Sequence, residues 1–258
     1  MHHRPFTTSA ASTCDAHLLR NVGHLTLPEK TVQVWVLRDA LVESVASELG
    51  HVLSPDERQR ARRYKREPYR NRFVARRSAL RCLLGSYLDR ASDAIEFSVT
   101  DSGRPYVQQR GARELAFNVS HTDGMAVMAF AWNCQLGVDV ERLIDGIDVA
   151  GIGHEVFSVS EERTLNDAHL DPSTTFFRIW TRKEALMKAL GAGLSSEAKS
   201  FTTRDDSELG EGHWRASKDG IPVTGWTYLD MNLGPQVSGA LAVSLEDAEV
   251  SVRPCATQ

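Results

Sequence analysis

The stretches Arg72–Gly85, RFVARRSALRCLLG, and Arg178–Gly191, RIWTRKEALMKALG, align without a gap at one constant offset. The identical residues are two arginines, an Ala-Leu pair and a final Leu-Gly pair, at Arg72/Arg178, Arg76/Arg182, Ala79-Leu80/Ala185-Leu186 and Leu84-Gly85/Leu190-Gly191. In each copy, apolar residues recur every three or four positions and a glycine follows the last turn, which is typical of an amphipathic helix with a left-handed C-terminal cap. We therefore predict two copies of one helix, with chance similarity over a short stretch as the alternative.

Matching signals flank both predicted helices. Ser54-Pro-Asp-Glu57 precedes the first helix and Ser158-Val-Ser-Glu161 precedes the second, and both have the serine-to-glutamate spacing of a capping box. Segments rich in β-branched and aromatic residues follow each helix and are predicted to be strands. These segments begin at Ile95, Leu115 and Ala126 in the first half and at Trp226 and Gly239 in the second.

The repeats predict an α+β fold built by duplication, in which each half is a long helix packed on a small antiparallel β-sheet. Residues 1–143 form the N-terminal subdomain and residues 144–258 the C-terminal subdomain, and the two are expected to be a pseudo-twofold pair. Since clefts at such interfaces are favoured places for ligands, we expect the functional site between the halves. We expect the first residues, about fifteen of them, and the tail after Asp247 to be poorly ordered.

The composition is that of an ordinary globular protein. The chain has 258 residues, of which 41% are hydrophobic and 25% charged. It has no apolar run long enough for a membrane span, and its start lacks the features of a secretory signal. Its four cysteines are scattered without a Cys-x-x-Cys pair. We therefore expect a cytoplasmic protein with reduced cysteines and no membrane partner.

One segment of this acidic chain is strongly cationic. Between Glu57 and Arg81 there are eleven Lys or Arg against two Glu, although the net charge of the whole chain is −4. Such a patch attracts a polyanion or an acidic protein partner through its local field, whereas a nucleic-acid-binding protein is usually basic overall. A solvated helix face is the alternative.

Two carboxylates share one face of a predicted strand in Leu136–Glu141, LGVDVE. Alternate residues of a strand point to the same side, so Val138 and Val140 face the core while Asp139 and Glu141 project together. Magnesium prefers a few carboxylates together with waters and substrate phosphate oxygens. The pair therefore suits a hard divalent ion, although an exposed acidic strand face would have the same pattern.

A third carboxylate lies on the second copy of the helix. Trp180, Glu184 and Lys188 follow one another at i, i+4 spacing and line one stripe. A surface Glu–Lys pair would stabilise the helix by about 0.3–0.5 kcal/mol, but it would not explain the aromatic residue on the same stripe. The first copy has Val74, Ser78 and Cys82 at these positions. This divergence favours specialisation of the second copy for catalysis.

The segments Gly103-Arg-Pro-Tyr106 and Phe117-Asn-Val-Ser-His121 add further polar groups. Gly-Arg-Pro is a turn that presents Arg104, and Ser120 and His121 lie at a strand end, where both can donate hydrogen bonds to phosphate. Neighbouring strand residues point to opposite faces, so Ser120 and His121 cannot be a nucleophile–base pair. We prefer a binding role for His121 over general-base catalysis.

Taken in order, GRPY, FNVSH, LGVDVE and W-x-x-KE-x-x-x-K followed by Gly-x-Gly-Leu resemble the Sfp-type 4′-phosphopantetheinyl transferases. The similarity extends from about Ser54 to Phe201. It implies a monomeric pseudo-dimer of two similar α+β halves. It also implies transfer of the 4′-phosphopantetheine arm of coenzyme A, the co-substrate, to a serine of an apo acyl or peptidyl carrier protein. This is holo-[acyl-carrier-protein] synthase activity, with adenosine 3′,5′-bisphosphate as the other product.

The resemblance implies a role for each matching residue. Asp139, Glu141 and Glu184 correspond to the magnesium-binding carboxylates. Lys188 corresponds to the lysine that contacts the phosphate and assists the departing group. Ser120 and His121 correspond to the pair that holds the nucleotide phosphates. Arg104 stands where many members have lysine, which keeps the charge but changes the donor geometry. In the basic segment, Arg60, Arg72 and Arg76 are our choices for phosphate contacts.

The implied chemistry is positioning and charge neutralisation around a pyrophosphate. We expect the carrier serine to attack the β-phosphate of coenzyme A with Asp139, Glu184 and Lys188 as catalytic residues. The base that deprotonates the serine is Glu184, Glu161 or a metal-bound water. Two rival functions are a nucleic-acid-binding module, which three carboxylates on two elements argue against, and another magnesium-dependent phosphoryl-transfer enzyme. The natural carrier protein and the tolerance for acylated coenzyme A stay open.

Overall fold

The computed structural model describes residue 19 and residues 23–109, 113–167, 169, 171–192, 196–206 and 208–255. The predicted disorder of the first residues therefore concerns a part of the chain outside the described residues, as does Cys14. The Gly193-Leu194 end of the Gly-x-Gly-Leu motif also lies outside them. Nowhere in the described ranges is a helix both long and apolar enough to cross a bilayer.

The described chain is a mixture of helices and strands, which confirms the α+β class. The α-helices are α2 (Val42–Leu49), α3 (Pro55–Arg62), α4 (Glu67–Leu88), α5 (Val149–Val156), α6 (Val159–Leu165) and α7 (Pro172–Leu190). The strands are β1 (Thr31–Arg38), β2 (Phe97–Val99), β3 (Pro105–Val107), β4 (Leu115–Thr122), β5 (Met125–Trp132), β6 (Leu136–Arg142), β7 (Phe201–Asp205), β8 (Trp214–Lys218), β9 (Ile221–Pro222), β10 (Thr227–Asp230), β11 (Val237–Val243) and β12 (Glu249–Pro254).

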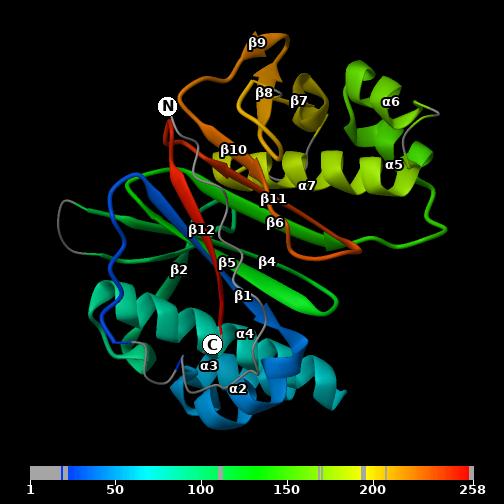
Figure 1. Cartoon of the computed structure of the whole chain (residues 1–258). Coiled ribbons are helices and arrows are strands. Elements are labelled where there is room, and N and C mark those ends of the chain that lie inside the picture. The colour runs from blue at the N-terminus through cyan, green and yellow to red at the C-terminus, as the bar shows by residue number, and fades with distance from the viewer. Residues whose placement is uncertain are drawn as a thin grey trace.

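Two sheets form the centre of the molecule (Figure 1). One has the strand order β12-β1-β5-β4 and the other has the order β10-β11-β6. Val34 and Val127 of the first sheet pack with Val138 and Leu241 of the second in one buried cluster, so the two sheets lie face to face. Helices α2 and α4 cover the outer face of the first sheet and α7 covers that of the second. The result is four layers, helix on sheet on sheet on helix.

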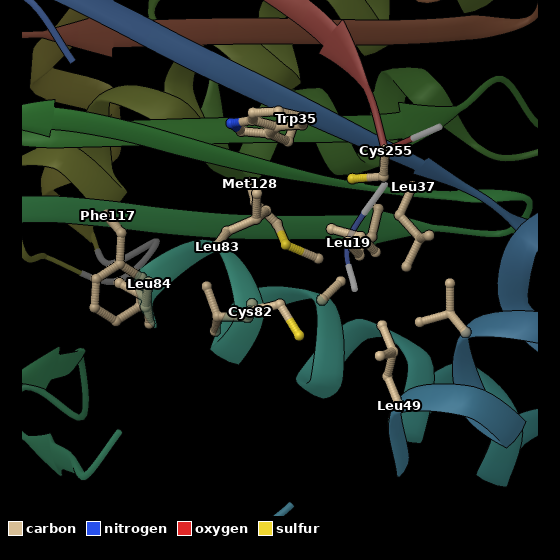
Figure 2. Packing of buried hydrophobic residues seen from close by; sticks show 14 of the residues in the cluster. Leu19, Trp35, Leu37, Leu49, Cys82, Leu83, Leu84, Phe117, Met128 and Cys255 are labelled. Atoms are coloured by element: carbon tan, nitrogen blue, oxygen red, sulfur yellow. The ribbon is translucent and has the colours of Figure 1, made fainter. Parts of the chain in front are cut away.

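The helix α4 is held to the first sheet by a large apolar core. Figure 2 shows Phe117 of β4, Met128 of β5 and Leu37 of β1 on the sheet side and Leu83 and Leu84 on the helix side. All five side chains are buried. Because a buried aliphatic or aromatic side chain contributes about 1.5–3 kcal/mol, this core fixes the position of α4 on the sheet.

The predicted capping boxes are confirmed at both positions. In α3, the Ser54 hydroxyl accepts from the Glu57 N–H and the Glu57 carboxylate accepts from the Ser54 N–H. Ser158 and Glu161 make the same reciprocal pair at the start of α6. Each glutamate is buried and also meets a cation from the long helix that follows. Glu57 pairs with Arg77 and Arg81 of α4, and Glu161 pairs with Lys183 of α7.

The predicted left-handed cap is found in only one of the two long helices. Gly191 ends α7 with a φ of 73°. The same prediction for Gly85 is wrong, because α4 continues to Leu88 and the left-handed residue is Asp89. A Cβ at Gly85 would lie 2.6 Å from the carbonyl oxygen of Arg90. This glycine therefore permits a close approach of the chain after the helix and does not form its cap.

The prediction of a poorly ordered tail after Asp247 is also wrong. Residues Glu249–Pro254 form β12, which pairs in parallel with β1. Cys255, labelled in Figure 2, is fully buried next to this pair. The partner of a parallel strand lies far away in the sequence, so nothing local in the tail indicates that it is ordered.

Candidate active site

The centre of the site is Asp139 on β6, the edge strand of its sheet. Val138 and Val140 point into the core between the sheets, which turns Asp139 toward α7 as the alternation predicts. The Asp139 side chain is 3% exposed. Its Oδ1 atom accepts hydrogen bonds from the hydroxyl of Ser120 and from Nζ of Lys188, each at 2.7 Å. Its Oδ2 atom is buried without a hydrogen-bond partner.

Helix α7 brings Lys188 and Glu184 to this strand because it packs directly on β6. Gly137 permits the close packing, since a Cβ there would lie 2.0 Å from the carbonyl oxygen of Ala185. Lys188 Nζ also donates to the Ser120 hydroxyl at 3.1 Å. The same stripe of α7 carries Trp180, but this ring stacks on Phe176 in a separate apolar cluster and serves packing.

The three predicted carboxylates influence one another. Burial, followed by the charge of Asp139, raises the pKa of Glu184 above its ordinary value. Burial and Asp139 likewise raise the pKa of Glu141, while a hydrogen bond from Thr122 opposes the shift. Because like charges raise the pKa of neighbouring acids, the site would gain from a cation among these carboxylates.

The donor atoms fit a hard cation such as Mg²⁺. They are carboxylate oxygens, and Oδ2 of Asp139 is buried with no hydrogen-bond partner. Over the described ranges, however, no three His, Cys, Asp or Glu side chains are arranged as a ready-made metal site. Magnesium commonly completes its ligand sphere with waters and substrate phosphates, so a partial set of protein ligands is compatible with it.

A cavity of about 550 Å³ opens beside this group, between α4 and the end of β4. Arg60, Arg72 and Arg76 line it together with His121, so the structure brings together the three chosen arginines and the predicted imidazole. Arg72 is held by Asp39 and Asp123 at 2.6 and 2.9 Å. The cavity therefore presents a cluster of cationic groups that a phosphate would complement.

His121 is neutral in this surrounding at neutral pH. Burial lowers the pKa of its imidazole below 6.5, and the charges of Arg76 and Lys188 lower it further. A neutral imidazole can donate one hydrogen bond to a phosphate. When a bound anion compensates the nearby arginine charges, the imidazole can also take up a proton and become positively charged.

Two predicted phosphate ligands, Ser120 and Arg104, do not line this cavity among the described residues. Ser120 points to the opposite side of β4 from His121 and makes its contacts with Asp139 and Lys188. The Arg104 guanidinium donates to the carbonyl oxygens of Lys188, Ala189 and Leu136 at 2.8–3.3 Å, where it joins α7 to β6.

The sequence reasoning missed the apolar walls of the cavity. Tyr64, Tyr69 and Phe73 line it, and the Arg60 guanidinium lies 5.2 Å from the Phe73 ring centroid. Tyr69 and Phe73 are three residues before Arg72 and Arg76, respectively, so the helical spacing in the sequence was sufficient to place them on the arginine face. The cavity thus combines aromatic surface with positive charge.

Comparison with known proteins gives matches over both halves of the chain. Residues 135–222 match the model of the 4′-phosphopantetheinyl transferase superfamily, and residues 43–133 match that of the 4′-phosphopantetheinyl transferase N-terminal region. The 4′-phosphopantetheinyl transferase HetI of Nostoc sp. is 34% identical over 174 residues, which are 67% of this chain and 73% of the relative. These matches do not support the alternative of a nucleic-acid-binding module.

Two further relatives have names of the same kind. The 4′-phosphopantetheinyl transferase of Bacillus subtilis is 34% identical over 58% of this chain and 71% of its own length. The L-aminoadipate-semialdehyde dehydrogenase-phosphopantetheinyl transferase of Schizosaccharomyces pombe is 30% identical over 55% of this chain and 60% of its own. The similarity thus includes bacterial and fungal proteins.

Proposed function

The chain belongs to the 4′-phosphopantetheinyl transferase superfamily, and on that premise we propose that it transfers the phosphopantetheine arm of coenzyme A to a carrier-protein serine where α7 and β6 meet β4. The observation that carries this proposal is the joining of Asp139, Lys188 and Ser120 beside a cavity of arginines. Carboxylates and cations next to each other are what a metal-assisted phosphoryl transfer from a pyrophosphate needs.

The nucleotide end of coenzyme A is proposed to occupy the cavity of about 550 Å³. Arg60, Arg72, Arg76 and His121 would hold its phosphates, and the aromatic walls offer surface on which a base can stack. Arg104 would act from outside the cavity, since its donors already join α7 to β6. Ser120 would hold Asp139 and Lys188 in position next to these phosphates.

Asp139, Glu141 and Glu184 are proposed to hold Mg²⁺, which would neutralise charge on the pyrophosphate. The support is the unpartnered Oδ2 of Asp139 and the raised pKa of the two glutamates. Lys188 would place its ammonium next to the departing phosphate, because it already projects from α7 toward β4. In this arrangement the protein positions the pyrophosphate and neutralises its charge, and it forms no covalent bond to the substrate.

Glu184 is the better of the two side-chain candidates for the base. Glu161 is 2% exposed, and both of its carboxylate oxygens already accept hydrogen bonds. Oε1 accepts from the N–H and hydroxyl of Thr203, and Oε2 accepts from Lys183 and the Ser158 N–H. Glu184 is partly exposed beside Asp139, so its carboxylate is accessible to a serine hydroxyl.

We propose that residues 1–143 and 144–258 are two halves related by duplication. In its support, the capping-box glutamates Glu57 and Glu161 each meet a cation at matched helix positions, Arg77 and Lys183. The halves would exchange strands, since β6 pairs with β11 and β12 returns to β1. The protein would be a cytoplasmic monomer.

The carrier protein is proposed to approach over the exposed cationic side chains of α3 and its loop. These are Arg58, Arg62, Arg63, Lys65 and Arg66, all exposed. Carrier proteins are typically acidic, so a positive surface of this kind would steer them. Transfer should then weaken steeply with salt, while coenzyme binding in the cavity weakens less.

The direct experiment is incubation with coenzyme A, Mg²⁺ and each of several apo carrier proteins, followed by intact-mass measurement. The proposal predicts that at least one carrier gains the mass of one phosphopantetheine arm and that a chelator prevents the gain. Hydrolysis of coenzyme A without any gain in carrier mass would instead indicate another magnesium-dependent phosphoryl-transfer enzyme.

A further inference from the structure

Arg72 reaches the coenzyme cavity from α4 and is paired with two aspartates through one of its nitrogen atoms. The Nη2 atom lies 2.6 Å from Oδ2 of Asp39 and 2.9 Å from Oδ1 of Asp123. A phosphate is bound best by two N–H groups on one edge of a guanidinium, and Nη2 belongs to both edges that offer such a pair. While both ion pairs are in place, Arg72 therefore cannot give a phosphate its strongest contact.

The two aspartates lie on different sides of Arg72. Asp123 lines the coenzyme cavity together with Arg72 and Arg76. Among the residues that the structure describes, Asp39 does not line this cavity. It lines a second cavity, of about 860 Å³, between α2 and the start of α4, where it again meets Arg72. An anion that enters the coenzyme cavity thus competes with Asp123 and not with Asp39.

The two ion pairs also differ in their exposure to water. The Asp123 side chain is 68% exposed, whereas the side chains of Asp39 and Arg72 are each 27% exposed. Exposed ion pairs contribute little to stability, because water and salt screen them. A phosphate group carries more negative charge than a carboxylate. It can therefore take the place of Asp123 on Arg72 more easily than that of Asp39.

The turn that carries Asp123 is itself held in place. Asp123 and Gly124 connect β4 to β5. The Gly124 carbonyl accepts from the Asp39 N–H at 2.9 Å, and the Thr122 carbonyl accepts from the Arg76 guanidinium at 3.4 Å. The main chain is thus fixed on both sides of Asp123. Displacement of the carboxylate needs only a rotation of its side chain, which is a fast motion for an exposed residue.

We infer that Asp123 occupies the place of a coenzyme phosphate on Arg72 in the free protein and is displaced when the coenzyme binds. Asp39 stays in contact and orients the guanidinium toward the cavity. This inference rests on the proposed function, because it needs the nucleotide end of coenzyme A to enter this cavity. Asp123 then limits the affinity for the coenzyme and for the bisphosphate product, and it favours release of that product.

The contact also balances charge in the empty cavity. Burial lowers the pKa of Arg76, and the charge of Arg72 lowers it further. The charges of Asp39 and Asp123 act in the opposite direction. Four arginines line the cavity, Arg60, Arg72, Arg76 and Arg77. Without a ligand, Asp123 compensates part of the positive charge that a phosphate compensates in the complex.

The test is calorimetry of adenosine 3′,5′-bisphosphate binding to the full chain at constant salt concentration, without a carrier protein. Asp123→Asn keeps the shape of the side chain and removes its charge, so we expect about two- to fivefold tighter binding. Asp39→Asn should instead weaken binding about twofold or more, because Arg72 loses the partner that orients it. Opposite signs for two aspartates on the same nitrogen atom are specific to displacement of one of them.

Asp56→Asn is the matched control for loss of charge alone. Asp56 is exposed on α3 and lines an adjoining cavity, which shares Arg60 and Tyr64 with the coenzyme cavity. Its replacement should change the affinity by less than about 1.5-fold. The same limit of about 1.5-fold applies to Asp123→Asn in an Arg72→Gln background, because no guanidinium is released there.

Unchanged or weaker binding by Asp123→Asn would overturn the inference. An equal gain from Asp56→Asn would also overturn it, as would a wild-type protein that does not bind the bisphosphate. Melting curves show whether each variant is folded, and if Asp39→Asn is not, the comparison with and without Arg72 decides the question. The proposed function fails on a different result, the absence of a mass gain in the carrier. Because the titration contains no carrier, the two failures are distinguishable.

Discussion

The Nζ atom of Lys188 on α7 lies 2.7 Å from Oδ1 of Asp139 on β6, and this ion pair fastens the helix to the strand at the centre of the site. The Asp139 side chain is almost fully buried, while that of Lys188 is 29% exposed. The lysine therefore supports a carboxylate that has little access to water, while its own side chain stays partly exposed.

Replacement of Lys188 by methionine should affect both stability and transfer. It leaves the buried Asp139 charge without its cation, and breaking such a pair typically costs about 3 kcal/mol of unfolding free energy. Urea unfolding measures that loss, and a single-turnover transfer assay measures the second effect. Lys188→Arg should recover most of the stability and less of the transfer, because a guanidinium is planar and larger. Unchanged unfolding of Lys188→Met would contradict this description of the pair.

Gly137→Ala should separate α7 from β6. The added Cβ would lie 2.0 Å from the Ala185 carbonyl oxygen and 2.5 Å from the Ala189 N, both main-chain atoms of α7. Overpacking of this kind typically costs about 1–3 kcal/mol, and we expect a lowered melting temperature with strongly reduced transfer. Gly23→Ala is the control, since its added Cβ meets nothing within 4 Å. Full transfer by Gly137→Ala would show that the close packing is unnecessary.

Glu57→Gln should destabilise the protein in a pH-dependent way. Burial alone would raise the pKa of Glu57, but hydrogen bonds from Arg81, the Ser54 N–H and Arg77 bring it below its ordinary 4.5. Its contribution to folding is therefore present above that pH and is lost as the pH falls through the folded-state value. The variant should lose about 3 kcal/mol at neutral pH, with a smaller difference from the wild type in acid.

Urea unfolding of both proteins at about pH 7 and about pH 4 checks this expectation. Asp56→Asn is a suitable control, because Asp56 is exposed in the same helical turn. It should change stability by about 0.3–1 kcal/mol through the helix dipole alone. If the difference in unfolding free energy between Glu57→Gln and the wild type grew as the pH fell, this expectation would be contradicted.

His121 should make coenzyme binding dependent on pH. Burial, Arg76 and Lys188 keep the pKa of the free imidazole below 6.5, and a bound phosphate would raise it. Affinity for adenosine 3′,5′-bisphosphate should therefore fall as the pH rises through the His121 pKa of the complex. Calorimetry on the wild type and His121→Asn isolates this effect, because the titration of the ligand itself is common to both. Parallel pH profiles for the two proteins would remove His121 from the phosphate site.

The sequence was most informative where chemistry and local structure coincide. LGVDVE predicted both the strand and the shared face of its carboxylates, because alternation is a property of any strand. The spacing of Trp180, Glu184 and Lys188 predicted a common stripe, and the two carboxylate-bearing elements do pack together. Both serine-to-glutamate capping boxes were also predicted correctly.

The sequence was least informative where the contact depends on distant segments. Ser120 and Arg104 have the right chemistry for phosphate, but the structure directs their donors to Asp139 and to carbonyl oxygens of α7. The pairing of β12 with β1 likewise joins the two ends of the described chain.

The most direct test of the central claim is a single-turnover measurement of carrier mass with coenzyme A and Mg²⁺, comparing the wild type with Glu184→Gln and Glu211→Gln. Glu211 is an exposed glutamate in the segment between β7 and β8, so its variant should match the wild type. The account predicts that Glu184→Gln folds with a normal melting temperature and adds the phosphopantetheine arm at least about a hundredfold more slowly. Transfer by Glu184→Gln at the wild-type rate would contradict it.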